Sequence, residues 1–144
     1  MVHVDVQFNS ASQVDFTARG RQLTNNRQPA ADGPVGFTSM ELLLIALGNC
    51  AIGTLLSQEP LRTTTVRSVT ASIDGEMAHE PTRLRRIEMS VELTIDDASV
   101  LDHHSALEAA TEHCPVGNTL RGAVEVATTL RLKAEPTDGS PAGD

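Results

Sequence analysis

Two cysteines are the side chains of this chain best suited to redox chemistry. Cys50 ends the almost wholly apolar stretch "LLLIALGNC", and Cys114 lies in "EHCPVGNTL", directly before a proline. A thiolate can attack an oxidising substrate, and a second thiol nearby can trap the oxidised sulfur as a disulfide. The residues alone leave a second interpretation open, in which both thiols are inert packing in the core.

The two cysteines differ in the local structure predicted around them. Pro115 suits the first position of a helix, so we expect Cys114 at the N-cap, where the helix dipole and free N–H groups would lower the thiol pKa. Cys50 is predicted to lie inside an apolar helix, where desolvation disfavours the thiolate. A reactive Cys50 therefore requires an arginine from another part of the fold or from a second chain.

Alternation of apolar and polar residues predicts the strands that must support this site. The clearest pattern is "RRIEMSVELTID", in which every second residue from Ile87 to Ile95 is apolar. The first two predicted strands form an N-terminal hairpin with one face on the core, and the next two form an antiparallel pair. The predicted strands are 2–8, 13–20, 66–75, 85–96 and 123–135.

Helical patterns surround both cysteines. Thr38 or Ser39 can cap a helix over 40–56 that is apolar on nearly every face, so we expect this helix to be buried on most sides. A membrane span is disfavoured, because a span needs about 20 predominantly apolar residues and this run contains polar ones. Two further helices are predicted at 98–114 and 115–122. The segment 25–37 is rich in Asn, Pro and Gly and predicts a loop.

The composition limits the class of protein. The 144 residues suit a single α+β domain over 1–135, followed by a tail at 136–144 that we expect to be disordered. A net charge of −8 and the absence of Trp and Tyr argue against nucleic-acid and membrane partners. The N-terminal residues lack the pattern of a secretory signal, which predicts a cytoplasmic protein. The histidines lack zinc-site spacing, so no metal is expected. They are His3, His79, His103, His104 and His113.

Three sequence stretches resemble a known family. "GPVGFTSMELLLIALGNCAIGTLL" and "HCPVGNTL" are similar to the two cysteine motifs of the OsmC/Ohr family of thiol peroxidases, and "EPTRLRRIEMSVEL" is similar to that family's second strand. The resemblance implies an OsmC-like α+β fold with antiparallel sheets packed on a long buried central helix. It also implies an intertwined homodimer, in which an arginine of one chain lies near the cysteines of the other.

The resemblance further implies a reaction. The cysteine matching Cys50 reduces a small organic hydroperoxide and becomes a sulfenic acid, and the cysteine matching Cys114 then forms a disulfide with it. An external dithiol, such as a lipoyl protein, reopens the disulfide, and no resident cofactor is needed. Arg19 and Arg21 are the candidate partners of the thiolate.

One position departs from the pattern of the efficient peroxidases in the family. They have a glutamate where this chain has Met40, and Glu41 follows one residue later, about 100° further round the helix. Glu41 is therefore a candidate site residue whose direction the sequence leaves open. The alternative function is a non-catalytic redox sensor or a binding protein for a small lipophilic ligand.

Overall fold

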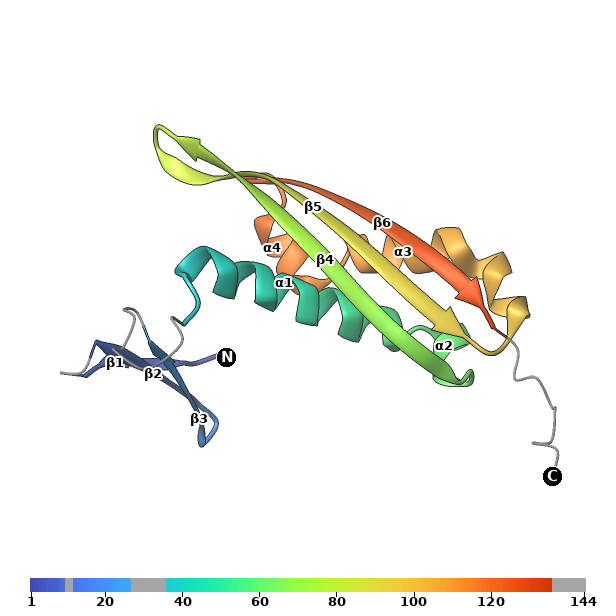
Figure 1. Cartoon of the computed structure of the whole chain (residues 1–144), viewed down its shortest axis with the longest axis horizontal. Helices are drawn as coiled ribbons and strands as arrows, with labels where there is room; N and C mark the ends of the chain where they lie inside the picture. Colours follow the sequence, from blue (N-terminus) through green and yellow to red (C-terminus); the bar gives the residue numbers. More distant parts are fainter. Residues whose placement is uncertain (10–11, 27–35, 136–144) are drawn as a thin grey trace, which may run out of the picture. The chain divides into compact units, whose positions relative to one another are not determined.

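The computed structural model describes residues 1–9, 12–26 and 36–135. The predicted tail and most of the predicted loop at 25–37 lie outside these residues. The chain divides into two compact units, Met1–Leu43 and Leu44–Asp144. Both contain a three-stranded sheet, and the second also contains helices (Figure 1), so the α+β class is confirmed.

The first unit contains an antiparallel sheet in the order β1 (Asp5–Phe8), β2 (Gln13–Ala18) and β3 (Arg21–Asn26). The predicted hairpin is confirmed in β1 and β2, but the prediction missed β3, because the chain turns at Arg19 and Gly20 and returns as a third strand. The sequence of β3, "RQLTNN", has a single aliphatic side chain and therefore lacks the alternation that identifies a strand.

The apolar side chains of the first unit are largely exposed within the described residues. Val6 and Phe8 alternate as predicted, but they are 64% and 65% exposed, and Leu23 is similarly exposed. The alternation predicted that the face carrying Val6 and Phe8 packs on a hydrophobic core. Within the described residues of one chain, these side chains stay exposed.

The second unit contains the longest strands. Its sheet has the order β4 (Val66–His79), β5 (Thr82–Ile95) and β6 (Glu125–Ala134). β4 and β5 form an antiparallel hairpin, but β6 runs parallel to β5. The predicted antiparallel pairing is therefore confirmed for β4 and β5, whereas β6 departs from it. The chain between β5 and β6 forms helices that carry it back to the start of β5, which is the crossover that parallel strands require.

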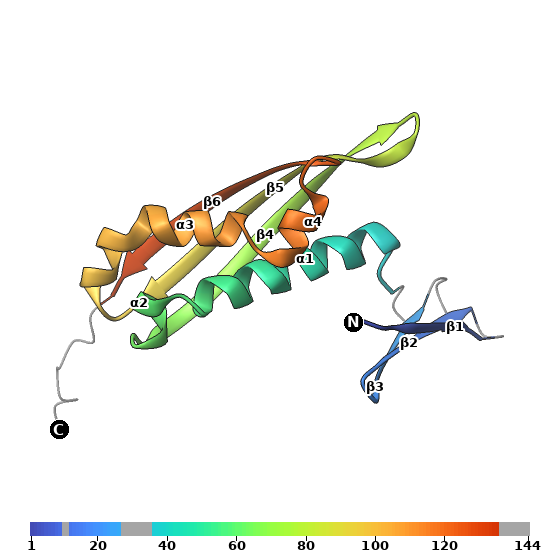
Figure 2. The same cartoon turned by 180° about the vertical axis from the view of Figure 1, so that it is seen from behind.

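Helices cover one face of this sheet. Figures 1 and 2 show α1 (Ser39–Leu56), α3 (His104–Glu112) and α4 (Pro115–Leu120) on the same side of β4, β5 and β6. The alternation in β5 is confirmed, because its helix-facing residues are buried and the residues between them are exposed or partly exposed. The buried ones are Leu84, Ile87, Met89, Val91, Leu93 and Ile95.

Helix α1 buries a single stripe against the second unit. Leu47, Gly48, Ala51 and Leu55 are buried, whereas Ile45 is 47% exposed. Burial on the other faces stays a prediction that requires a second chain. Among the described residues, α1 alone has the length and apolar composition to cross a membrane. This is weak evidence for a span, since the core helix of a soluble protein meets the same criteria.

The predicted single helix at 98–114 is interrupted. Residues Ala98–His103 form a 3-10 helix, η1, and α3 begins at His104. The Asp97 side chain accepts a hydrogen bond from the Ser99 N–H at 2.8 Å and so caps this tighter turn. A four-residue helix, α2 (Glu59–Arg62), also follows α1.

Helix α3 is attached to β6 by two of its side chains. His104 Nε2 lies 2.6 Å from the Leu130 carbonyl, and a Glu108 carboxylate oxygen accepts from the Leu130 N–H at 2.9 Å. Both main-chain groups of Leu130 are therefore bonded to α3. These contacts fix the helix that leads directly to Cys114.

Candidate active site

The structure brings the two cysteines together. Cys50 lies on α1, and Cys114 is the N-cap residue of α4. The Val116 N–H points at Cys50 Sγ at 3.5 Å, and the Gly117 N–H donates to Cys114 Sγ at 3.3 Å. The Cys50 side chain also raises the pKa of the Cys114 thiol. Both sulfurs therefore lie at the first turn of α4, although the roles assigned to them stay predictions.

Two glycines permit this close packing. A Cβ at Gly48 would lie 2.7 Å from Ile73 Cδ1, so this position lets α1 approach β4. A Cβ at Gly117 would lie 3.2 Å from Cys114 Sγ and 3.7 Å from Leu47 Cδ1. Gly117 therefore leaves room for the buried thiol and for the α1 side chain beside it.

The helix N-terminus was predicted to lower the pKa of the Cys114 thiol, and this prediction was wrong for the net shift. Burial raises the pKa of the Cys114 thiol, and the influence of the nearby Cys50 side chain acts in the same direction. The backbone N–H groups of Gly117 and Val116 oppose this shift, as predicted, but they are the weaker influence. The Cys114 side chain is 0% exposed, so desolvation outweighs the helix terminus. The raised pKa of Cys114 disfavours its thiolate and so argues against Cys114 as the residue that attacks first.

Two polar side chains that the sequence interpretation missed bridge the turn between α3 and α4, which contains Cys114. The Asn118 amide donates to the His113 carbonyl at 3.0 Å, and the Arg121 guanidinium donates to the Glu112 carbonyl. The available signal was the end of α3, where helix carbonyls need partners from outside the helix. His113, which directly precedes Cys114 in the chain, directs Nδ1 to the Ala109 carbonyl at 2.7 Å and caps α3.

The candidate arginines belong to the first unit, whereas the cysteines belong to the second. Arg19 and Gly20 form the two-residue turn between β2 and β3, and Arg21 begins β3. The backbone of Arg19 has φ = 51° and that of Gly20 has φ = 73°, so both residues are left-handed. Pairing of either arginine with a thiolate stays a prediction.

The Glu41 carboxylate caps helix α1. It accepts a hydrogen bond from the Thr38 N–H at 2.7 Å, while Thr38 Oγ1 accepts from the Glu41 N–H at 3.2 Å. This reciprocal pair is a capping box, and its signature is the sequence Thr38-Ser39-Met40-Glu41. The geometry gives Glu41 a structural role, and its proposed place in the chemistry stays a prediction.

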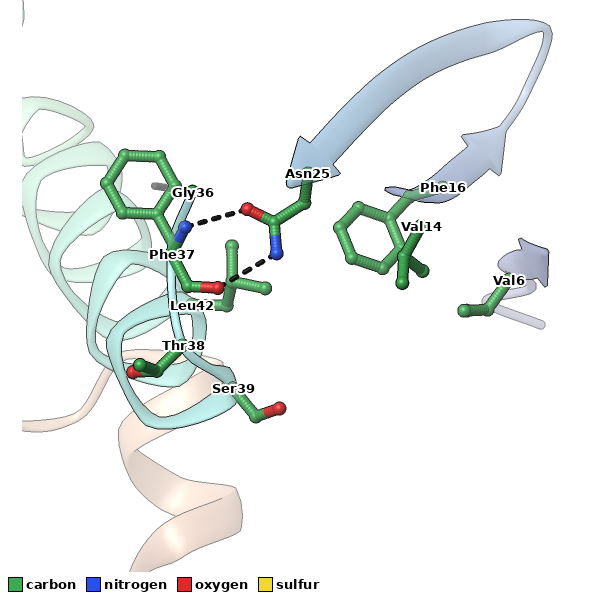
Figure 3. A pocket seen from close by; sticks show the side chains of 9 residues that line it. All are labelled: Val6, Val14, Phe16, Asn25, Gly36, Phe37, Thr38, Ser39 and Leu42. Atoms are coloured by element: carbon green, nitrogen blue, oxygen red, sulfur yellow. Dashed lines mark hydrogen bonds between the residues drawn. The ribbon is translucent and has the colours of Figure 1, made fainter. Parts of the chain in front are cut away.

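A pocket of about 440 Å³ lies in the first unit. Figure 3 shows Val6, Val14 and Phe16 on the strand side and Leu42 on the helix side, with the Asn25 amide facing the Phe37 main chain. Asn25 donates to the Phe37 carbonyl at 2.8 Å and accepts from its N–H at 2.7 Å. Thr38 and Ser39 add hydroxyl groups to the lining, so the pocket combines an apolar wall with a few polar groups.

The histidines are possible metal ligands, and their positions and contacts test that role. No group of three or more His, Cys, Asp or Glu side chains in the described part of the chain is arranged to hold a metal ion. His104 and His113 are both bonded to main-chain carbonyls, and His3 pairs with Asp5 at 3.2 Å. These contacts give the three side chains local structural roles.

Comparison with known proteins identifies the family. The model of the family described as OsmC-like protein matches residues 31–129, which include both cysteines. The chain therefore belongs to the OsmC-like family, and the predicted family membership is confirmed. None of the curated proteins matches the sequence.

Solved structures share the fold at low sequence identity. An OsmC-like protein from Mycoplasma pneumoniae is 19% identical, with a TM-score of 0.75 over 92% of this chain and 97% of the other. The organic hydroperoxide resistance protein OhrB of Bacillus subtilis is also 19% identical, with a TM-score of 0.59 over 92% and 98%. An organic hydroperoxide resistance protein OsmC from Legionella pneumophila is 15% identical, with a TM-score of 0.60 over 91% and 96%. At these identities the likeness establishes the fold.

Proposed function

We propose that the protein is a thiol-dependent peroxidase that reduces small organic hydroperoxides. The observation that carries this proposal is the meeting of two free thiols from distant parts of the chain at the start of α4. Family membership supports it, because two of the similar structures are named organic hydroperoxide resistance proteins.

Cys50 is the attacking residue and Cys114 the resolving one. Cys50 is partly exposed, whereas Cys114 is buried and burial raises its pKa. The Cys50 thiolate takes the terminal oxygen of the hydroperoxide, and the O–O bond breaks. The alkoxide leaves as an alcohol after protonation, and sulfur is oxidised to sulfenic acid. Cys114 then displaces water to form the disulfide, and an external dithiol, such as a lipoyl protein, reduces it.

Arg19 is the preferred partner of the Cys50 thiolate. A two-residue hairpin turn with both residues left-handed favours Asn-Gly, and an arginine at the first position costs about 1 kcal/mol. A residue retained at a strained position is a candidate for function. Arg21 begins β3 without such strain and is the second choice.

An intertwined homodimer would complete the site. The exposed apolar residues of the first unit, among them Val6, Phe8 and Leu23, need a cover, and so does Ile45 on α1. A second copy would bury these surfaces and bring its arginine turn towards the thiols. Reaction at this interface would take place in a mostly apolar setting, which suits a lipophilic hydroperoxide better than hydrogen peroxide.

A second candidate function rests on the pocket of the first unit. Its volume of about 440 Å³ and apolar wall suit a small lipophilic ligand. In this case the protein would be a binding protein or redox sensor, and the cysteines would report on oxidation without turnover.

Turnover separates the two functions. The wild-type protein and the Cys50→Ser and Cys114→Ser variants are mixed with cumene hydroperoxide and dihydrolipoamide. The peroxidase predicts continuous consumption by the wild type, none above background by Cys50→Ser, and impaired turnover by Cys114→Ser. Retention of a lipophilic probe without hydroperoxide consumption would instead support the binding protein.

A further inference from the structure

We propose that Asn118 and Arg121 are positioning residues for Cys114. They hold the resolving thiol against Cys50, so that oxidised Cys50 forms a disulfide before it is oxidised further. This inference rests on the proposed peroxidase function and assigns a determinant of its second step.

The two hydrogen bonds cross over Cys114. Their acceptors, the carbonyls of Glu112 and His113, directly precede the cysteine in the chain. Their donors, the side chains of Asn118 and Arg121, follow it. Each bond therefore closes a small loop that contains Cys114, and the two loops have different lengths.

Few other hydrogen bonds hold the turn between α3 and α4 in place. Helix α3 ends at Glu112, and Pro115 begins α4 without an N–H group. The Asn118 N–H bonds to the Cys114 carbonyl at 2.8 Å, but this bond lies within α4 and does not reach the residues before the cysteine. The side-chain bonds from Asn118 and Arg121 are thus the ones that tie α4 back to the end of α3.

The position of α4 also sets the position of the Cys50 sulfur relative to Cys114. The Val116 N–H approaches Cys50 Sγ at 3.5 Å, and the Gly117 N–H holds Cys114 Sγ at 3.3 Å. A shift of this short helix would move both donors at once. Since a disulfide requires Cβ atoms about 3.8 Å apart, a small displacement of α4 would slow the reaction between the sulfurs.

The competing reactions make this position important. In the productive step, the Cys114 thiol attacks the Cys50 sulfenic sulfur, the S–O bond breaks, and water leaves as the disulfide forms. In the damaging step, a second hydroperoxide oxidises the sulfenic acid to sulfinic acid and is itself reduced to an alcohol. The position of Cys114 affects disulfide formation and leaves the oxidation to sulfinic acid unchanged.

Asn118 and Arg121 are exposed side chains, so their truncation removes little from the core. The test uses Asn118→Ala, Arg121→Ala and the double variant. Thr119→Ala is the matched control, because Thr119 makes a side-chain bond to the Pro115 carbonyl at 2.9 Å that stays within α4. Arg121→Lys retains a cation that can reach the Glu112 carbonyl.

Two rates are measured after one equivalent of cumene hydroperoxide is mixed with the reduced protein. Hydroperoxide loss reports the first step, and thiol titration of acid-quenched samples reports the disulfide. We expect the first rate to stay within about twofold of wild type in every variant, because the Val116 N–H contacts Cys50 Sγ only at the long distance of 3.5 Å. The disulfide rate should fall about fivefold in each alanine variant and more in the double variant, as expected for the loss of one hydrogen bond each.

Two further readouts separate positioning from a general loss of structure. Sulfinic Cys50, detected by intact mass at excess hydroperoxide, should accumulate in the double variant and stay at the wild-type level in Thr119→Ala. Arg121→Lys should recover most of the disulfide rate. Equal disulfide rates and equal sulfinic yields in the double variant and wild type would overturn the inference. A fall of both rates together would also overturn it, since that pattern indicates a disturbed fold.

Diamide makes the outcome independent of the peroxidase proposal. This oxidant converts a pair of thiols to a disulfide and is itself reduced to a hydrazine, without any peroxide chemistry. If wild-type protein fails to consume hydroperoxide, the proposed function fails. Slower disulfide formation with diamide in Asn118→Ala and Arg121→Ala would still support the positioning role, and unchanged diamide rates would refute it.

Discussion

Substitution of Glu41 distinguishes a helix cap from a catalytic residue. Its carboxylate accepts from the Thr38 N–H at 2.7 Å, and the Thr38 hydroxyl accepts from the Glu41 N–H at 3.2 Å, at the start of α1. Glu41→Gln keeps an oxygen that can accept from the Thr38 N–H but removes the charge. Glu41→Ala removes both. The pair of variants therefore tests geometry and charge separately.

The structure sets the size of each effect. Loss of an exposed capping bond costs about 0.5–1 kcal/mol, and loss of a negative charge in the first turn costs about 0.3–1 kcal/mol. Glu41→Ala should therefore lower the free energy of unfolding by about 1–2 kcal/mol. Glu41→Gln should lower it by less than about 1 kcal/mol. For a chain of this length, 1 kcal/mol corresponds to about 2–4 °C in Tm.

A double-mutant cycle with Thr38→Ala tests whether the two bonds act together. Each single substitution removes the acceptor of one bond and leaves the other bond in place, so the double variant should lose about as much stability as the two single losses added, and any difference measures the coupling between the bonds. Urea denaturation followed by circular dichroism measures the three values. A Glu41→Ala protein as stable as wild type would refute the capping assignment.

The same variants report on the chemistry. If Glu41 acts only as a cap, Glu41→Gln should keep wild-type hydroperoxide turnover, and Glu41→Ala should keep it at temperatures well below its Tm. A tenfold loss of turnover in Glu41→Gln, with stability near wild type, would instead return Glu41 to the set of catalytic residues.

Two further predictions concern the arginine turn and pH. Arg19→Asn should stabilise the protein by about 1 kcal/mol, because asparagine favours the left-handed conformation, and should lower hydroperoxide turnover at least tenfold. The control variant Arg21→Asn should change neither stability nor turnover. A fully active Arg19→Asn protein would exclude Arg19 as the thiolate partner. The hydrogen bond from the Ser99 N–H lowers the pKa of Asp97, so its stabilising contribution is complete above the unfolded-state pKa of about 4 and is lost as the pH falls through the lower folded-state pKa. Urea denaturation of wild type and Asp97→Asn across this acidic range should show a smaller pH dependence in the variant, and parallel curves would contradict this account.

Local sequence patterns predicted the elements in which residue type follows directly from burial or helix position. Strict alternation identified β5, since residues on one side of a strand share one face. The apolar run identified α1, and the Cys114-Pro115 pair identified the start of α4. Both cysteine motifs also carry the family resemblance that the family model confirms. These features depend on residues that are close in the sequence, so the sequence alone predicts them.

Tertiary structure decided what depends on distant partners. Strand β3 is held by backbone pairing with β2 and has no apolar pattern of its own, and the parallel direction of β6 follows from the crossover through α3 and α4. The pKa of Cys114 depends on how completely the fold excludes water, which no motif records. Likewise, the carbonyl partners of Asn118 and Arg121 are set by the angle between two helices. Chain order alone gives residue types and spacing, whereas burial and hydrogen-bond partners arise only when separate segments pack together.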